Sequence, residues 1–518
     1  MSALAVEWTA GLRWASPVDP SGVQGASTGF QGVLLPGMST QTNTVRYISL
    51  FVAARHHRMQ AGREAEARLS WTEHLRRLEA LIAVSSVRHH RRDGQVPTGV
   101  VGIGAGHSMA SSQVVRLHTG LVQPPYSIYR GTLAGLGLSD LSQSTDPLFD
   151  SAKPLAVAWD PRQAGPLADA ICAGVLPETV PLDVIDAACA AFCLCRVPDG
   201  TSEQEQLSHL LLGIDRQFAA PRFGGDEEDP LAMRAVTWRF VLELVALSPG
   251  EPLADTRLIA RLMRPDLLDA PLKAPLRACL FAWRWVAART LFERGWTVVF
   301  ERALNVLRGE REGMDRAALV AALGDLYHRD STDALADVAQ TAQDSCQDSS
   351  WLLARLTSRR PADLLKAMCA GIYAALRDQE RHQPQPPSLL EALWHRGPIP
   401  FDAVHRSLQD RLAAGSSAAS LWAQWGEQAL LQHITSSLQK MRSPDNPDSL
   451  LCDYEGGVWR IPAKVGNARP NLAGAGSRLD IALSWARQLG LVTADGSGGL
   501  ILTPAGERYR ARWDDEHA

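Results

Sequence analysis

Apolar residues recur three and four positions apart along most of the chain. The pattern is clearest in AEARLSWTEHLRRLEALIAVSSV at 65–87 and in LRACLFAWRWVAARTLFERGWTVVFERALNVL at 276–307. This spacing puts apolar side chains on one face of a helix. It also predicts helices over 63–91, 165–215 and 400–442, whereas strand-like alternation is confined to short runs. The sequence therefore predicts a mainly α, multi-domain helical protein with a few short strands.

Breaks in the helical pattern divide the chain. Pro124-Pro125 ends the first block, RHQPQPPS at 381–388 has the composition of a linker, and RSPDNPDS at 442–449 makes a further break. A chain of 518 residues is long enough for several domains. The predicted segments are an N-terminal helical domain at 1–125 with a short strand or loop at 99–106, a central helical domain at 126–380, a Pro-rich linker at 381–399, a helical connector at 400–448 and a winged-helix-like domain at 449–518.

The C-terminal segment has a different pattern. GSRLDIALSWARQLG at 476–490 predicts an amphipathic helix, and LVTADGSGGLILTPAGERY at 491–509 predicts a hairpin and the start of a last helix. Asp495-Gly496 and Gly498-Gly499 supply the positive φ angles of a hairpin tip. This order resembles a C-terminal winged helix-turn-helix, in which the helix presents polar side chains to a DNA groove and the wing touches the backbone.

The C-terminal segment also carries a local excess of positive charge. The whole chain has a net charge of −4, so no global basic field indicates nucleic-acid binding. Residues 458–512 contain eight Lys or Arg and three Asp or Glu, and this surplus of positive charge can bind phosphates. Winged helices also dock proteins, so protein binding stays open as an alternative. The residues predicted to contact nucleic acid are Arg460, Lys464, Arg469, Arg478, Arg487, Gln488, Arg508 and Arg510.

Two Arg-His-His-Arg tetrads occur, at 55–58 and at 88–91. Adjacent histidines on a helix point about 100° apart, so one pair rarely chelates one metal. Positive charge at a helix C-terminus is favourable, and a solvated basic helix end is one interpretation. Phosphate contact is the alternative, and it would involve Arg55, Arg58, Arg88, Arg91 and Arg92.

Cysteine usage predicts a reduced, cytoplasmic protein. Eight cysteines are scattered along the chain, and no signal peptide or transmembrane run is evident. Cys189, Cys193 and Cys195 form C-x3-C-x-C. On a continuous helix only the first two share a face, and no histidine lies nearby in the sequence. Buried structural cysteines are therefore expected, with no metal site and no cofactor.

GHSMA, at residues 106–110, is close to the nucleophile elbow of serine hydrolases. An elbow needs a strand before it, a helix after it and a parallel sheet around it, and the preceding hundred residues are mainly helical. The overlapping glycines of VVGIGAG lack the acid that a dinucleotide site requires about twenty positions later. We expect no catalytic residue here and glycines that serve close backbone packing. A Ser108 hydrolase or an unrecognised nuclease is the enzymatic alternative.

Three short motifs resemble a family of poorly characterised bacterial proteins. The genes of that family lie in anti-phage defence islands beside helicases and phospholipase-D-like nucleases. The residues that carry the resemblance are Leu34, Leu35, Pro36, Gly37, Ser39, Thr40, Arg46 and Tyr47, then Pro125, Ser127, Ile128, Tyr129, Leu133, Leu136 and Gly137, and finally Val458, Trp459, Arg460, Ile461, Leu483, Ala486, Arg487 and Leu489.

The resemblance implies membership of a defence complex and supplies no catalytic residues. Together with the basic C-terminal segment, it predicts a non-catalytic subunit that engages DNA or acts as a scaffold. Partner proteins of the helicase or nuclease type would supply catalysis, and double-stranded DNA would be a further partner, with no membrane involved. The alternative within the binding class is an adaptor that contacts only proteins.

Overall fold

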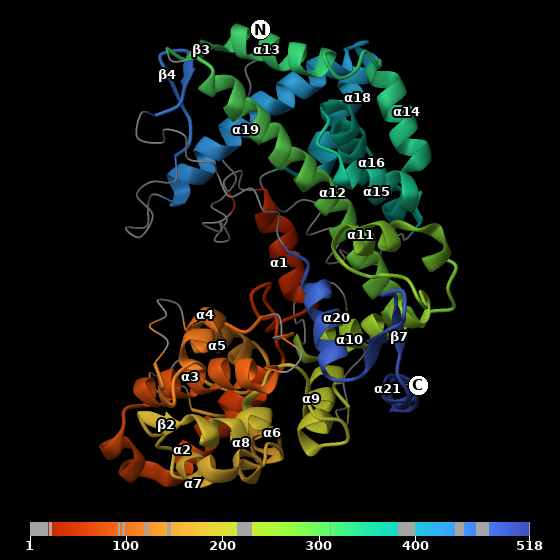
Figure 1. Ribbon diagram of the computed structural model, residues 1–518. Coiled ribbons are helices and arrows are strands. Elements are labelled where there is room, and N and C mark those ends of the chain that lie inside the picture. The colour runs from red at the N-terminus through yellow and green to blue at the C-terminus, as the bar shows by residue number, and fades with distance from the viewer. Residues whose placement is uncertain are drawn as a thin grey trace. The chain divides into compact units, whose positions relative to one another are not determined.

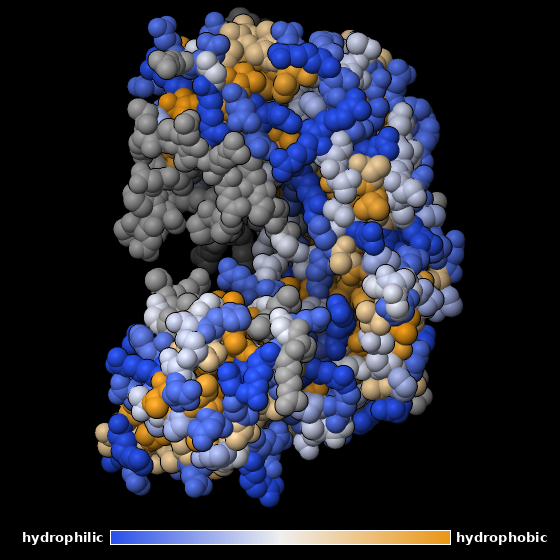
Figure 2. All heavy atoms as spheres, in the orientation of Figure 1, coloured by the Kyte–Doolittle hydropathy of each residue, from blue (hydrophilic) through white to orange (hydrophobic). Residues whose placement is uncertain are grey.

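A computed structural model describes residues 19, 23–91, 94–95, 99–118, 120, 124–141, 147–214, 230–310, 312–381, 399–440, 450–462 and 476–516. The described chain is mainly helical with a few two- and three-residue strands, which confirms the predicted class (Figure 1). No described helix is both long and apolar enough to cross a bilayer. On the face drawn in Figure 2, hydrophilic residues predominate and apolar residues lie in separate groups.

The chain divides into two compact units, and each draws on segments far apart in the sequence. Unit 1 comprises 1–33, 222–228 and 254–476, and unit 2 comprises 34–221, 229–253 and 477–518. The predicted segments were instead consecutive along the chain. The segment predicted at 449–518 is shared between the units, because residues up to 476 belong to unit 1.

Unit 2 contains most of the N-terminal half and the C-terminal part of the predicted winged-helix-like module, from residue 477 on. Its helices are α2 (Arg46–Arg68), α3 (Trp71–His89), α4 (Ile103–Met109), α5 (Pro125–Gly135), η1 (Asp150–Ala152), α6 (Lys153–Ala158), η2 (Pro161–Leu167), α7 (Ala168–Cys172), α8 (Leu182–Phe192), α9 (Ser202–Leu212), α10 (Pro230–Ala246), α20 (Arg478–Gln488) and α21 (Pro504–Glu516). Its strands form two antiparallel pairs, β1 (Val114–Arg116) with β2 (Thr179–Pro181) and β6 (Val492–Ala494) with β7 (Leu500–Leu502).

Helix α3 organises the part of unit 2 that holds the candidate site. Its residues from Leu78 to Val87 are buried, and it packs chiefly on α8 and α4. The predicted helix over 63–91 is broken at its start, because the Ser70 hydroxyl accepts a hydrogen bond from the Glu73 backbone and caps a new helix. Helix α3 then ends at His89, and His90 leaves the helical conformation with φ −99° and ψ 17°.

The C-terminal segment of unit 2 has the predicted order of helix, hairpin and helix, but a winged helix is not confirmed. Helix α20, strand β7 and helix α21 all pack on α10, which belongs to a distant part of the sequence (Figure 1). The rings of Trp238 and Trp485 stack at 6.4 Å between α10 and α20. At the hairpin tip, only Gly498 among the four predicted turn residues has a positive φ. This segment is therefore an integral part of the unit 2 core.

Unit 1 is built around one long helix. Its elements are most of α1 (Gln24–Leu34), α11 (Asp255–Met263), η3 (Pro265–Leu267), α12 (Ala274–Arg308), α13 (Arg316–His328), α14 (Leu335–Ser345), α15 (Ser349–Thr357), α16 (Pro361–Arg381), α18 (Phe401–Ala413) and α19 (Ala418–Lys440), with strands β3 (Met314–Asp315), β4 (Asp453–Glu455) and β5 (Val458–Arg460). The strands form an antiparallel sheet in the order β3-β5-β4.

Helix α12 packs on α16 and α19, and its tryptophans are buried. A side chain at Gly371 would place Cβ 2.5 Å from the Ala288 carbonyl oxygen, so glycine is needed where α16 meets α12. The buried Arg284 guanidinium donates two hydrogen bonds to Asp378, at 2.7 and 3.1 Å. Close backbone contact and a buried ion pair therefore join α16 to α12.

Candidate functional site

The GHSMA segment does not have the geometry of a nucleophile elbow. The predicted strand or loop at 99–106 is a turn followed by helix α4, which begins at Ile103. Ser108 lies inside this helix and is exposed, rather than at a turn between strand and helix. Gly106 is buried against α3, where an added Cβ would lie 2.7 Å from the Ala83 carbonyl oxygen. This glycine serves close helix packing, as expected.

Two of the polar residues predicted to contact DNA from α20 bond within unit 2. The Arg478 guanidinium donates to the Leu35 carbonyl at 3.3 Å, and burial lowers the pKa of Arg478 to about 10. The Gln488 side chain accepts from the Val45 amide at 2.9 Å and donates to the Asn43 carbonyl at 2.8 Å. These contacts fix both ends of α20 to the segment that precedes α2.

The other predicted cations differ in their surroundings. Arg510 forms a bidentate ion pair with the buried Glu243 of α10, whereas Arg487 and Arg508 are exposed. Arg460 is also exposed, on β5 of unit 1. Lys464 and Arg469 lie outside the described residues.

The first Arg-His-His-Arg tetrad is largely part of the core. Arg58 is 2% exposed and donates to the carbonyl oxygens of Gly174, at 2.7 Å, and of Leu69. The Arg55 guanidinium lies over the Trp71 ring, 4.8 Å from its centroid. Both arginines therefore have structural roles, which differ from the predicted phosphate contact.

In the second tetrad the arginines are held by one carboxylate of α8. Arg88 pairs with Asp186 through two hydrogen bonds of 2.6 Å, and Arg91 reaches the same carboxylate at 2.7 Å. The two guanidinium groups hold the pKa of Asp186 below its ordinary value. Arg92 lies outside the described residues. These ion pairs fasten the end of α3 to α8.

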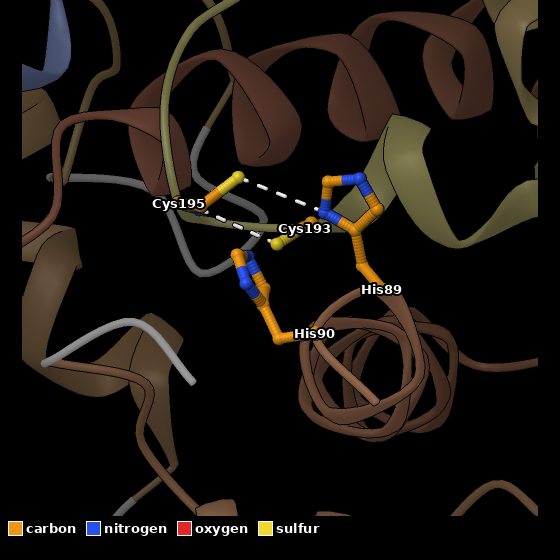
Figure 3. A group of neighbouring side chains, drawn as sticks. All are labelled: His89, His90, Cys193 and Cys195. Carbon is orange, nitrogen blue, oxygen red and sulfur yellow. Dashed lines mark hydrogen bonds between the residues drawn. The ribbon is translucent and has the colours of Figure 1, made fainter. Parts of the chain in front are cut away.

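The histidines of the same tetrad meet two cysteines. His89, His90, Cys193 and Cys195 each place one nitrogen or sulfur atom within 4.8 Å of those of the other three. Figure 3 shows the four side chains pointing toward one another, from the end of α3 and from the segment after α8. Cys195 Sγ lies 3.7 Å from His89 Nδ1. We call these four residues the His–Cys cluster.

Two helix ends explain how this arrangement forms. His89 is the last residue of α3 and His90 has left the helix, so the 100° offset between successive helical side chains does not apply. Helix α8 ends at Phe192, and Cys193 is extended with φ −68° and ψ 139°. In an extended segment, residues two apart point the same way, so Cys193 and Cys195 share a side while Leu194 is buried. The expectation that Cys195 faces away rested on a continuous helix and is wrong.

A buried arginine fixes the backbone that carries the cysteines. Arg46, 1% exposed, donates to the carbonyl oxygens of Ala190, at 3.1 Å, and Cys193, at 2.5 Å. Its other nitrogens pair with the buried Glu203 at 3.2 and 3.3 Å. The Cys195 amide donates to Cys193 Sγ at 3.4 Å. These bonds fix the backbone of the segment that carries the two thiols.

The electrostatics of the cluster favour one thiolate. A hydrogen bond with Cys193, supported by hydrogen bonds from His90 and His89, lowers the pKa of Cys195. The same bond, together with burial, raises the pKa of Cys193. Two cysteine sulfurs and two imidazoles thus share a small space. These are the donors that zinc and other soft or borderline metal ions prefer.

Sequence reasoning singled out both halves of the cluster and did not join them. The histidines and the cysteines lie about a hundred positions apart, and only the packing of α3 on α8 brings them together. The local signal that was available is a pair of metal-ligand residue types at each of two helix ends.

The chain matches no protein-family model, no curated protein and no solved structure. The resemblance to defence-island proteins therefore stays a prediction. Function has to be argued from the residues of this chain alone.

Proposed function

We propose that the protein is a non-catalytic scaffolding subunit of a bacterial anti-phage defence complex. In this proposal the helical units bind partner proteins, and helicase- or nuclease-type partners perform the chemistry. The proposed role in a defence complex rests on the resemblance of the sequence to defence-island proteins. One observation favours scaffolding over DNA reading, namely that α20 is built into the unit 2 core.

A DNA-reading helix must leave its polar side chains available to base edges. On α20, Arg478 and Gln488 bond to backbone groups of unit 2, while Trp485 is buried and donates from Nε1 to the Thr42 carbonyl at 2.7 Å. Arg487 is the one predicted DNA-contacting residue of this helix that is exposed. Base readout by α20 would therefore require these bonds to break, whereas phosphate contact by exposed arginines would not.

Point variants test this better than truncation, because removing α20 would expose the apolar surface of α10. We predict that the full chain binds duplex DNA only with the weak, salt-sensitive affinity of non-specific contact, with Kd about 10⁻⁴–10⁻⁶ M at physiological salt. Replacing Arg487, Arg508 and Arg512 together by Ala should weaken binding no more than replacing the exposed Arg63, Arg68 and Arg76 of α2 and α3. Fluorescence anisotropy with a labelled duplex, titrated with salt, measures both.

A tenfold or larger loss confined to the first triple variant would favour the DNA-engaging role instead. The scaffolding role has its own measurement. Co-expression with the proteins that the neighbouring genes encode should yield a complex that elutes as one species in size-exclusion chromatography. Failure to form any complex, together with plaque counts that do not change on deleting the gene, would contradict the proposal.

A further inference from the structure

We propose that His89, His90, Cys193 and Cys195 bind one Zn²⁺ ion as a closed, structural site. This proposal does not depend on the scaffolding function. Zinc in structural sites takes four protein ligands in a tetrahedron, and two cysteines with two histidines are a common set. The His–Cys cluster supplies this number and these types, one ligand atom from each side chain.

The distances fit a small contraction onto the ion. Zn–S bonds of about 2.3 Å and Zn–N bonds of about 2.0–2.1 Å put tetrahedral ligand atoms about 3.3–3.8 Å apart. The ligand atoms here lie within 4.8 Å of one another, and Cys195 Sγ is already 3.7 Å from His89 Nδ1. Binding would require the ligand side chains, including those of His89 and His90 at a helix end, to move closer by about 1 Å.

The donor set selects the metal. Two thiolates and two imidazoles suit Zn²⁺, whereas Mg²⁺ and Ca²⁺ prefer oxygen ligands and iron–sulfur clusters are held mainly by thiolates. With both thiols deprotonated, the two negative charges neutralise the ion. Four protein ligands also leave no open position for water or substrate, which makes the site structural rather than catalytic.

Contacts around the His–Cys cluster hold its backbone in place. Arg46 holds the Cys193 carbonyl, and the Arg88–Asp186 and Arg91–Asp186 ion pairs fix α3 to α8 on the side of the histidines. Such outer contacts orient ligands and are a regular feature of metal sites. Zinc would join the end of α3 to the segment after α8, and so close a loop of about a hundred residues.

The segment that carries the cysteines also contacts the end of α20 within unit 2. Val197, two residues after Cys195, donates from its amide to the Gln488 carbonyl at 3.0 Å. Gln204 donates from Nε2 to the Leu489 carbonyl at 2.7 Å. A metal that fixes Cys193 and Cys195 therefore also steadies the segment on which the end of α20 rests.

Metal content of the purified full chain tests the proposal. Protein expressed with added zinc and dialysed without chelator should carry about one zinc per chain by elemental analysis. Cys195→Ser and His89→Ala should carry little or none. Cys189→Ser is the matched control, because Cys189 is a half-buried thiol of α8 outside the cluster, and it should retain the metal. His89 is exposed, so His89→Ala should fold even where a buried ligand variant does not.

Two measurements on the unmutated chain keep the test decisive if the variants misfold. Cobalt replacing zinc should give the visible absorption of a tetrahedral ion and a thiolate-to-cobalt charge-transfer band. Zinc should also protect two thiols from a thiol reagent, and a chelator should expose them. Zinc well below one per chain with no thiolate–cobalt band, or metal retained by both ligand variants, would overturn the proposal.

Discussion

Two regions of unit 2, helix α20 and the His–Cys cluster, differ in how their polar side chains are used. The polar side chains of α20 look available in the sequence, yet Arg478 and Gln488 bond to neighbouring backbone groups. The His and Cys residues of the cluster lie in two separate motifs of the sequence that predict no metal site, yet their four side chains point at one another. Both regions carry polar side chains at or beside the end of a helix, so position in the sequence alone does not separate them.

The difference lies in what the polar groups bond to. Hydrogen bonds from side chains to backbone amides and carbonyls satisfy groups that folding would otherwise leave unpaired, and they serve stability. Several metal-ligand side chains gathered around one point serve no such need. Two imidazoles and two thiols instead make a site that gains most from a bound cation. A convergent set of donors therefore indicates function more strongly than a local excess of charge.

The largest expected change in stability comes from removing the Trp485 side chain, which packs α20 against α10. We predict that Trp485→Ala lowers the free energy of unfolding by about 3–5 kcal/mol, because it leaves a cavity against Trp238 and removes the bond to the Thr42 carbonyl. Chemical denaturation followed by circular dichroism measures the change. Arg487→Ala, exposed on the same helix, should change it by less than about 0.5 kcal/mol. A small effect of Trp485→Ala would mean that α20 is a detachable module after all.

The next largest expected effect is on the pH dependence of stability and concerns a buried carboxyl of α3. Glu79 is 2% exposed and accepts a hydrogen bond from the Tyr126 amide at 2.7 Å, and burial raises its pKa to about 7. A carboxyl with a raised folded-state pKa binds more protons when folded, so its contribution falls as pH rises from about 4.5 to 7. We predict that Glu79→Gln removes about 2–3 kcal/mol of this pH dependence.

The comparison of wild type and Glu79→Gln is made from pH 5 to 8 in the presence of chelator. The chelator matters because zinc binding weakens as pH falls, when protons compete for the ligands. That dependence has the opposite sign to the contribution of Glu79. Parallel stability curves for the two proteins would show that Glu79 does not titrate in this range.

The helical architecture could be predicted because its signal is local. The spacing of apolar residues over 65–87 and 276–307 identified helical segments, and most of both is helical in the structure. The break within 63–91 also had a local signal, since Ser70 and Glu73 have the spacing of a capping box. The division into two units had none. Residues 229–253 join 34–221 and 477–518 through packing alone.

The His–Cys cluster could not be predicted from the sequence for a related reason. Its two halves are adjacent only because α3 packs on α8, and their geometry depends on where each helix ends. A continuous helix through Cys195 would turn that thiol away, whereas ending at Phe192 turns it inward. A shift of three residues in one helix boundary thus decides whether a metal site exists. Boundaries are the part of a helix that propensity specifies least.

The smallest effect concerns GHSMA, the segment that looked most like an active site. We predict that Gly106→Ala lowers the free energy of unfolding by about 1–3 kcal/mol, because the new Cβ would lie 2.7 Å from the Ala83 carbonyl oxygen and force α4 away from α3. Ser108→Ala, two positions on and exposed, is the matched control and should change it by less than about 0.5 kcal/mol.

The same pair of variants separates packing from chemistry. If the segment only packs and the protein acts in phage defence as proposed, protection in a plaque assay should follow stability, so Gly106→Ala reduces it and Ser108→Ala does not. Loss of protection by a stable Ser108→Ala protein would instead restore the hydrolase alternative, as would labelling of Ser108 by a fluorophosphonate probe. Because Ser108 lies within α4 rather than at a strand-to-helix turn, we expect neither outcome.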